Sequence, residues 1–210
     1  MDSRRSTRLF ALSAALAVAA GLGAAAYFAF VPRDGDPFAD CRSSTVAGGV
    51  ATIGGPFSLT DGDGRRVTDK DVLTGPTLVY FGYSFCPDFC PTDLARNALV
   101  ADELASRGVR VGQVFITIDP ARDTPPVVRD FAAAIHPDLV GLTGTPEEIA
   151  AAAAAFRVYY RKADTTDYYM MDHSTFTYLV DPAHGFLEFY GSNATPDEVA
   201  TSVACYASRL

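Results

Sequence analysis

Basic residues are scarce in this sequence. Seventeen lysines and arginines stand against 25 aspartates and glutamates, a formal net charge of −8 over 210 residues. Residues 1–31 contribute three arginines and one aspartate, so the remainder carries −10. Such an acidic chain is a poor candidate for binding nucleic acid, whose phosphates attract basic surfaces. Solubility accounts for the charge more simply than a basic partner surface would, although both fit.

The chain also lacks internal repeats and has few cysteines and histidines, four and three respectively. At this length, a chain without repeats holds one ordinary domain plus an appendage. The hydrophobic fraction of 49% is ample for a packed core. Four cysteines allow only three sets of disulfide pairs, so the role of each cysteine can be argued separately.

The appendage is the N-terminal segment, residues 1–31. Three arginines precede an uncharged, mostly apolar run of 23 residues from Leu9 to Val31. As a helix this run would be about 34 Å long, enough to cross a hydrocarbon core of roughly 30 Å. We therefore predict a cytoplasmic stub and a single transmembrane helix, with the rest of the chain exported. A cleaved signal peptide is the alternative, since Gly23–Ala26 resembles a cleavage site, but the apolar run is longer than usual.

Residues 32–52 are predicted to be a linker rich in Gly, Asp and Ser, and residues 53–210 the folded domain. An exported domain meets oxidising conditions, which favour disulfides. Cys86 and Cys90 are neighbours and form a functional pair, which leaves Cys41 before the domain and Cys205 in its last predicted helix. We predict a structural disulfide between Cys41 and Cys205. Two unrelated free thiols are the alternative.

The domain alternates between β and α patterns after a predicted N-terminal β-hairpin. Capping boxes that begin at Thr145 and Thr195 predict the starts of two helices. The predicted strands are 56–60, 65–68, 77–83, 109–118, 139–143, 174–180 and 186–190, and the predicted helices are 90–106, 124–136, 145–157 and 195 onward. This order predicts an α/β domain with helices on both faces of one sheet.

The motif Y-F-G-Y-S-F-C-P-D-F-C-P, which starts at Tyr80, carries most of the chemical information. Cys86 and Cys90 follow a buried-looking strand, and Cys90 opens a helix whose positive end favours the thiolate. Reactive groups beyond the carboxyl end of such a strand indicate a thioredoxin-like arrangement. Thiolates four residues apart can close a redox disulfide or share one metal ion. A permanent structural disulfide is the simpler alternative, but such bridges seldom lie at a strand-to-helix junction flanked by aromatic residues.

His173 is the third candidate, just before a predicted strand. A neutral imidazole beside two thiolates makes a set that suits Cu(I), Cu(II) with an added ligand, or zinc. Alone, a histidine in this position is more often an ordinary polar residue, and the other two histidines look ordinary. Met170 and Met171 are core residues or soft ligands. Asp172 either orients His173, adds an oxygen ligand or faces solvent.

From about Ile53 to Leu210 the chain resembles the Sco/SenC family, membrane-anchored copper proteins of cytochrome c oxidase assembly. Three motifs carry the resemblance in the same order: the cysteine motif from Tyr80, I-T-I-D-P-A-R-D-T-P from Ile116 and D-H-S from Asp172. The predicted N-terminal anchor also matches.

The resemblance implies a thioredoxin-like fold that binds one copper ion, Cu(I) or Cu(II), through Cys86, Cys90 and His173. It also places the turn Asp119–Asp123 near the site as structural support. The pair Cys41 and Cys205 lies outside the family motifs, so the predicted disulfide rests on this sequence alone. The arginines before the apolar run place the predicted anchor in a bacterial-type inner membrane, with the N-terminus cytoplasmic and the domain in the periplasm.

Two functions fit these residues. The first is a metallochaperone that takes copper from an upstream periplasmic donor and delivers it to the binuclear copper centre of cytochrome c oxidase subunit II. The second is a thiol–disulfide oxidoreductase that reduces the acceptor cysteines, with Cys86 attacking and Cys90 resolving. His173 favours copper delivery, because a dithiol reductase needs no distal imidazole. A peroxiredoxin-like peroxidase has only Thr92 and Arg96 near Cys90 in its favour.

Overall fold

The computed structural model describes residues 18, 20–23, 36–44, 53–164 and 168–210. The chain divides into two compact units, residues 1–39 and 40–210. The predicted transmembrane helix lies almost entirely outside the described residues. Among the residues that are described, none belongs to a helix long and apolar enough to span a membrane. Residues 40–44 of the predicted linker belong to the second unit, which also contains every candidate site residue.

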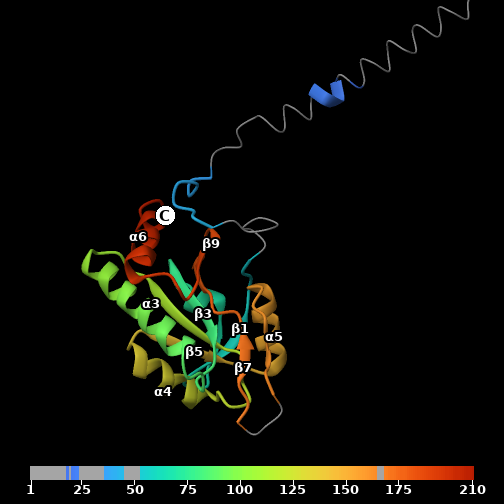
Figure 1. The fold of residues 1–210 in the computed structure, drawn as a ribbon, viewed down its shortest axis with the longest axis vertical. Coiled ribbons are helices and arrows are strands. Elements are labelled where there is room, and N and C mark those ends of the chain that lie inside the picture. The colour runs from blue at the N-terminus through green and yellow to red at the C-terminus, as the bar shows by residue number, and fades with distance from the viewer. Residues whose placement is uncertain (1–17, 19, 24–35, 45–52, 165–167) are drawn as a thin grey trace, which may run out of the picture. The chain divides into compact units, whose positions relative to one another are not determined.

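The second unit is built on a seven-stranded mixed sheet with the order β2-β1-β5-β4-β3-β8-β9 (Figure 1). Its strands are β1 (Ser58–Asp61), β2 (Arg66–Thr68), β3 (Thr77–Gly82), β4 (Gly112–Thr117), β5 (Leu139–Thr143), β8 (Thr177–Asp181) and β9 (Gly185–Tyr190). The central strands β3, β4 and β5 pair in parallel, and β3 pairs antiparallel with β8. All six residues of β3 are buried, because both of its faces are covered.

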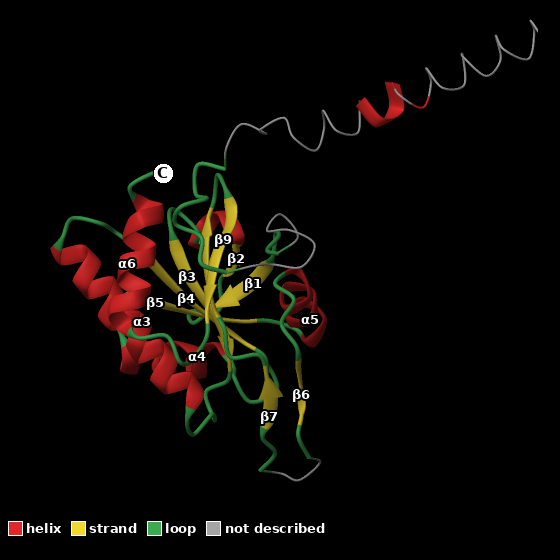
Figure 2. Ribbon diagram, turned by 45° about the horizontal axis from the view of Figure 1, so that its top comes forward, coloured by secondary structure: helices red, strands yellow, loops and turns green. Residues whose placement is uncertain are grey.

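The helices lie on both sides of this sheet (Figure 2). They are α2 (Asp69–Val72), α3 (Phe89–Ser106), α4 (Pro125–Ile135), α5 (Pro146–Ala155) and α6 (Pro196–Ala207). Helices α3, α4 and α6 cover one face, and α5 covers the other. Phe115 of β4 packs on Phe131 of α4 at 5.0 Å between ring centroids, and Phe81 of β3 packs on Phe156, just after α5, at 5.2 Å. The predicted α/β sheet with helices on both faces is confirmed.

Local signals in the sequence explain where these helices begin. Thr145 and Thr195 each accept a hydrogen bond from the backbone N–H of the glutamate three residues later, which closes the predicted capping boxes. Proline follows each threonine in the first turn, where its missing N–H costs nothing. The start of α4 follows the same rule, with Thr124 before Pro125.

The sequence patterns miss three short elements. These are α2 and a separate two-stranded ribbon formed by β6 (Tyr160–Lys162) and β7 (Met171–His173). His173, expected just before a strand, is the last residue of β7 and pairs with Tyr160. The strand expected at 174–180 is β8, which starts only at Thr177. Three residues are too few for a periodic signal, which is why the ribbon escapes prediction.

Candidate metal centre

A tight loop connects β3 to α3 and carries Cys86. The Cys86 N–H donates to the carbonyl of Tyr83 at 3.2 Å, which folds the loop back towards the sheet. Asp88 precedes the first helical residue, and its carbonyl accepts a bond from Thr92 Oγ1 at 2.9 Å. Cys90 therefore lies in the first turn of α3, at the strand-to-helix junction that the sequence predicts. Cys86 is half-buried, and Cys90 is fully buried.

Gly82, the last residue of β3, gives Cys90 room to approach the sheet. A Cβ atom at this position would lie 2.7 Å from Cys90 Sγ and 2.9 Å from Cε1 of Tyr80. Both distances are below ordinary van der Waals contact. The glycine in Y-F-G-Y is thus required by a close approach between strand and thiol, and not by backbone conformation.

The structure brings together Cys86, Cys90 and His173, whose ligand atoms all lie within 4.8 Å of one another. Cys90 Sγ and His173 Nε2 are 3.6 Å apart. With metal–sulfur and metal–nitrogen bonds of about 2.3 and 2.0 Å, two such ligands on one ion lie about 3.5–3.8 Å apart. The three side chains therefore fit one thiophilic metal ion. Of the described histidine, cysteine, aspartate and glutamate residues, these alone form a cluster of three with ligand spacing.

A backbone contact fixes the proton on the His173 ring. Its Nδ1 lies 2.8 Å from the carbonyl oxygen of Ser174, which can only accept a hydrogen bond, so Nδ1 carries the hydrogen. The lone pair of Nε2 then faces the sulfur atoms, as a metal ligand requires. Tyr83 also holds the imidazole, with its ring edge-on at 5.8 Å between centroids.

Strand alternation separates His173 from its neighbour Asp172. Along β7, Met171 is buried, Asp172 is exposed and His173 is half-buried. The Asp172 carboxylate pairs with the Arg161 guanidinium of β6 at 2.9 Å. Asp172 therefore faces solvent, and it neither orients His173 nor adds an oxygen ligand to the centre. Met170 Sδ lies 4.0 Å from the Tyr83 hydroxyl, and Met171 is packed in the core.

The two thiols differ strongly in acidity. The hydrogen bond with the Cys90 side chain, followed by bonds from the backbone amides of Cys90 and Asp88, lowers the pKa of Cys86 to about 3, although burial opposes this. The same contact with Cys86, together with burial, raises the pKa of Cys90. In the reduced, metal-free protein Cys86 is therefore the thiolate, and Cys90 keeps its proton. This is the arrangement of an attacking and a resolving cysteine. The thiolate expected at Cys90 from its place at the start of the helix is thus wrong, because burial and the contact with Cys86 outweigh the helix dipole.

The turn Asp119–Asp123 holds the cysteine loop against the sheet. Asp123 is fully buried, and its carboxylate accepts bonds from the Ser84 N–H at 3.0 Å and from the Ser84 hydroxyl. Its backbone carbonyl accepts a bond from Thr143 Oγ1 of β5 at 2.6 Å. The resemblance predicts support from this turn, but the Ser84 partner has no signal in the sequence.

Arg122 of the same turn reaches the segment that leads into β7. Its guanidinium stacks on the Tyr169 ring at 3.8 Å and on Phe85 at 4.9 Å from the ring centroids. It also donates to the Tyr169 carbonyl at 2.9 Å and pairs with Asp119, whose carboxylate accepts a bond from the Tyr169 hydroxyl at 2.7 Å. One turn therefore contacts both halves of the metal centre, the cysteine loop and the approach to His173.

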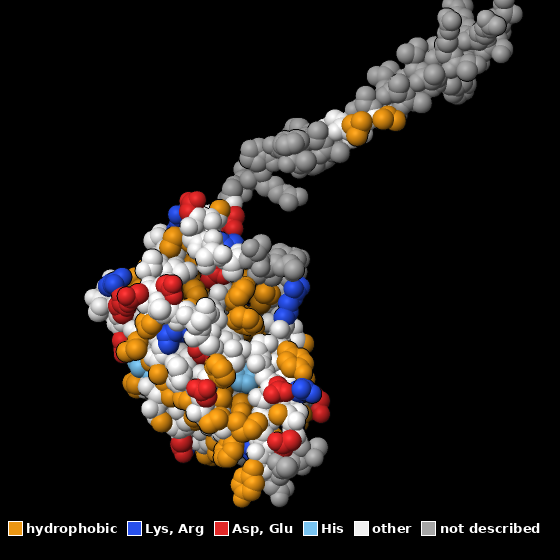
Figure 3. Space-filling model, viewed as in Figure 1, with side chains coloured by type: hydrophobic (Ala, Val, Ile, Leu, Met, Phe, Trp, Pro, Cys, Tyr) orange, Lys and Arg blue, Asp and Glu red, His pale blue; other side chains and the backbone are white. Residues whose placement is uncertain are grey.

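A cavity of about 370 Å³ lies beside the half-buried Cys86 and extends to His173. Its walls come from the cysteine loop and from residues 170–175. Phe85 and Phe89, on either side of Cys86, are 52% and 50% exposed. Figure 3 shows hydrophobic side chains gathered on the part of this face around β7. The thiolate can therefore be reached from one side, across an apolar rim.

The remaining candidates lie apart from this centre. His136, at the end of α4, contacts Asp102 at 3.2 Å, and His184, in the β8–β9 turn, contacts Asp181 at 2.9 Å. Arg96 is committed to a buried network with Asp93 and with backbone carbonyls beyond β9. It does not support the cysteines in the manner that a peroxidase would need.

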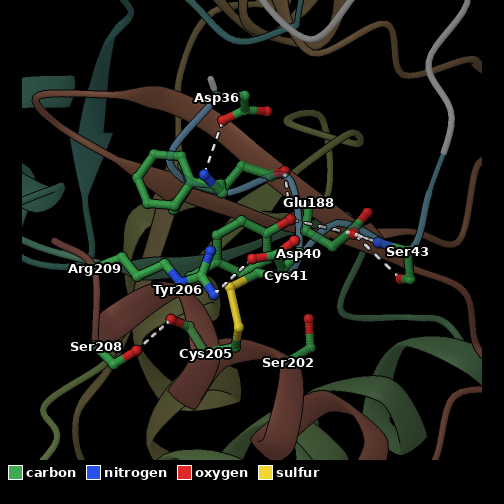
Figure 4. Close-up of a disulfide and its surroundings, with 12 residues drawn as sticks. Asp36, Asp40, Cys41, Ser43, Glu188, Ser202, Cys205, Tyr206, Ser208 and Arg209 are labelled. Carbon is green, nitrogen blue, oxygen red and sulfur yellow. Dashed lines mark hydrogen bonds and ion pairs between the residues drawn. A yellow bond between two sulfur atoms is a disulfide. The ribbon is translucent and has the colours of Figure 1, made fainter. Parts of the chain in front are cut away.

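A disulfide joins Cys41 to Cys205 of α6, across 164 residues of sequence (Figure 4). Residues next to Cys41 are also hydrogen-bonded to the domain. Ser43 N–H donates to the buried carboxylate of Glu188 at 2.8 Å, and Arg42 donates to the Leu187 carbonyl of β9. Residues 41–44, the N-terminal strap, are thus fastened beside β9 and α6.

Comparison with known proteins agrees with this fold and site. The SCO1/SenC family model matches residues 46–208. Protein SenC of Rhodobacter capsulatus is 50% identical over 206 residues, which cover 98% of this chain and 93% of SenC. The copper-bound ScoI structures of Arabidopsis thaliana and Bradyrhizobium japonicum are 44% and 41% identical, with TM-scores of 0.69 and 0.66. They cover 75% and 73% of this chain and 98% and 99% of their own, and they share its thioredoxin-like fold. The chain belongs to the SCO1/SenC family.

Proposed function

We propose that this protein is a copper metallochaperone for cytochrome c oxidase assembly. It holds one copper ion at Cys86, Cys90 and His173 and passes it to the binuclear centre of oxidase subunit II. The observation that carries the proposal is the approach of two cysteine sulfurs to an imidazole nitrogen whose lone pair is free. Two thiolates and one imidazole satisfy three-coordinate Cu(I), and an added ligand completes a Cu(II) site.

The unequal burial of the three ligands suits delivery as well as binding. Cys90 is fully buried, whereas Cys86 borders the open cavity. A ligand of the acceptor would therefore displace Cys86 first, and Cys90 and His173 would hold the ion until exchange is complete. The exposed aromatic rim around Cys86 supports a protein partner at this face, since such surfaces are typical of interfaces.

An anaerobic copper titration of the reduced full chain tests the assignment of the ligands. We expect one tightly bound copper per wild-type chain, with a sulfur-to-copper charge-transfer band in the Cu(II) form. His173→Ala should weaken Cu(I) binding by at least about tenfold, the equivalent of about 1.4 kcal/mol. The Cys86–Cys90 disulfide should still form in that variant.

His184→Ala is the matched control, because it removes an imidazole from the β8–β9 turn outside the centre. Copper affinity in the control should equal that of wild type. An His173→Ala variant with undiminished affinity would contradict the proposed ligand set.

Thiol–disulfide exchange with the acceptor is the second candidate function, favoured by the low pKa of Cys86 beside a protonated Cys90. It acts before metal delivery, because oxidation of the pair removes two copper ligands. Rapid reduction of a peptide disulfide, with the Cys86–Cys90 pair oxidised to its own disulfide in return, would make this the main function if the wild-type chain binds no copper tightly.

We further propose that residues 1–31 anchor the chain in a bacterial-type inner membrane, with the domain in the periplasm, where an upstream copper donor loads it. The arginines and the long apolar run support this orientation. Protease treatment of spheroplasts tests it. Digestion of the domain is expected, whereas protection until the inner membrane is broken would contradict it.

A further inference from the structure

Tyr80, in the middle of β3, buries a hydroxyl that has no evident purpose in packing. Its side chain is fully buried, and its oxygen has no hydrogen-bond partner within the part of the chain that the structure describes. Two other buried tyrosines differ: Tyr190 contacts Ser202 Oγ at 3.0 Å, and Tyr206 donates to the Leu187 carbonyl at 3.2 Å. An unpaired buried hydroxyl is costly, and phenylalanine would fill the same space without that cost.

The Tyr80 ring lies directly beside the metal centre. The position where a Cβ of Gly82 would be is 2.9 Å from Cε1 of Tyr80 and 2.7 Å from Cys90 Sγ, so ring edge and sulfur are neighbours across the glycine. The ring also meets His173 edge-on, with centroids 6.4 Å apart. A tyrosine hydroxyl carries its proton at neutral pH and can donate a hydrogen bond.

The other polar neighbour, Asp93, is already engaged. Its carboxylate accepts a bond from the Ser192 hydroxyl at 2.7 Å and pairs with the Arg96 guanidinium at 3.2 Å. The sulfur of Cys90, which lies beside the edge of the Tyr80 ring, is the second polar group available as an acceptor. A thiol sulfur accepts hydrogen bonds weakly, whereas a thiolate accepts them well. A Cys90 sulfur held as a copper ligand would therefore be a suitable acceptor for the buried Tyr80 hydroxyl beside it.

We propose that the Tyr80 hydroxyl donates a hydrogen bond to Cys90 Sγ when the cysteine pair holds copper, which makes Tyr80 a positioning residue for the buried ligand. The inference rests on the proposed copper site and assigns a role to a residue outside it. The bond stabilises a thiolate that has little access to water. It also lowers the energy of the sulfur electrons, which sets the charge-transfer energy of the site.

The test compares Tyr80→Phe with Tyr178→Phe in the reduced full chain. Tyr178 is a matched control, because it is buried on the opposite face of the sheet against Phe81 and Phe156. Cu(I) affinity is measured by competition with a chromophoric chelator, and the Cu(II) form by absorbance. Tyr80→Phe should bind Cu(I) about tenfold more weakly. Its sulfur-to-copper band should move to longer wavelength, and Tyr178→Phe should match wild type in both.

Equal affinity and equal band position in the two variants would overturn the role of Tyr80 and leave the copper site intact. A wild-type chain without tight copper would remove the proposed function, and this inference with it. If Tyr80→Phe does not fold, proton NMR of the wild-type chain decides. Cu(I) loading should slow exchange of a tyrosine hydroxyl proton that has a nuclear Overhauser contact to the Cys90 β-protons, and absence of that signal would overturn the role.

Discussion

At the scale of single residues, the geometry predicts that the two motif cysteines behave differently as nucleophiles. In the reduced, metal-free chain the pKa of Cys86 is lowered to about 3 and that of Cys90 is raised. A thiol with the ordinary pKa of about 8.5 is ionised to only about one part in three thousand at pH 5. Iodoacetamide at pH 5 should therefore modify Cys86 alone, as peptide mapping can show. Its reactivity should stay nearly constant from pH 5 to 8 and fall only as the pH approaches 3, whereas a rate that climbs with a midpoint near 8.5 would refute this.

The sequence predicts the identity of these residues better than their geometry. Cys86 and Cys90 are found together because one helical turn separates them. His173 lies 83 residues further along the chain than Cys90, and only the family motifs connect it to them. Neither its proton position nor the acidity of Cys86 follows from sequence, because both depend on single contacts that the folded chain creates, such as the Ser174 carbonyl.

At the scale of elements, Arg122 connects the loop before α3 to the segment before β7, so its loss should loosen the His173 side of the centre. Arg122→Lys keeps the charge but loses the flat stack on Tyr169 and the forked reach to Asp119 and the Tyr169 carbonyl. We expect a decrease of about 1–2 kcal/mol in the free energy of unfolding. Hydrogen exchange at Met171–His173 should accelerate, and copper affinity should fall several-fold.

Arg129→Lys is the control for this change, because Arg129 lies half-exposed on α4 and pairs only with its neighbour Asp130 among the contacts described. Exchange in β7 should not change in the control. If Arg122→Lys leaves β7 exchange as slow as in wild type, the turn does not hold the ribbon.

Helices and strands are easier to predict from the sequence when they are long and when capping or turn residues mark their ends. Helix α5 has a capping box at Thr145, and the 18-residue α3 follows a strand of six buried residues, so both were found. The ribbon of β6 and β7 has three residues in each strand. This ribbon is held in place by tertiary contacts such as the stack of Arg122 on Tyr169. Such contacts cannot be predicted from a local sequence pattern.

At the scale of the whole second unit, the Cys41–Cys205 disulfide should stabilise the fold without tuning the metal centre. It closes 164 residues of chain and holds the N-terminal strap beside Glu188, while Cys86, Cys90 and His173 make no described contact with it. Replacing both cysteines by serine should lower the free energy of unfolding by at most about 5 kcal/mol, the chain-entropy value for so long a loop. Urea denaturation measures this, and Cu(I) affinity should remain that of wild type. The double variant Cys86→Ser/Cys90→Ser should bind no copper tightly and should lose less stability than the disulfide variant, because it opens no covalent loop and changes only the buried Cys90 position of the core. If the variant without the Cys41–Cys205 disulfide folds but binds Cu(I) more weakly than wild type, the disulfide and the metal centre are coupled. That result would contradict the prediction that the disulfide stabilises the fold without changing the metal centre.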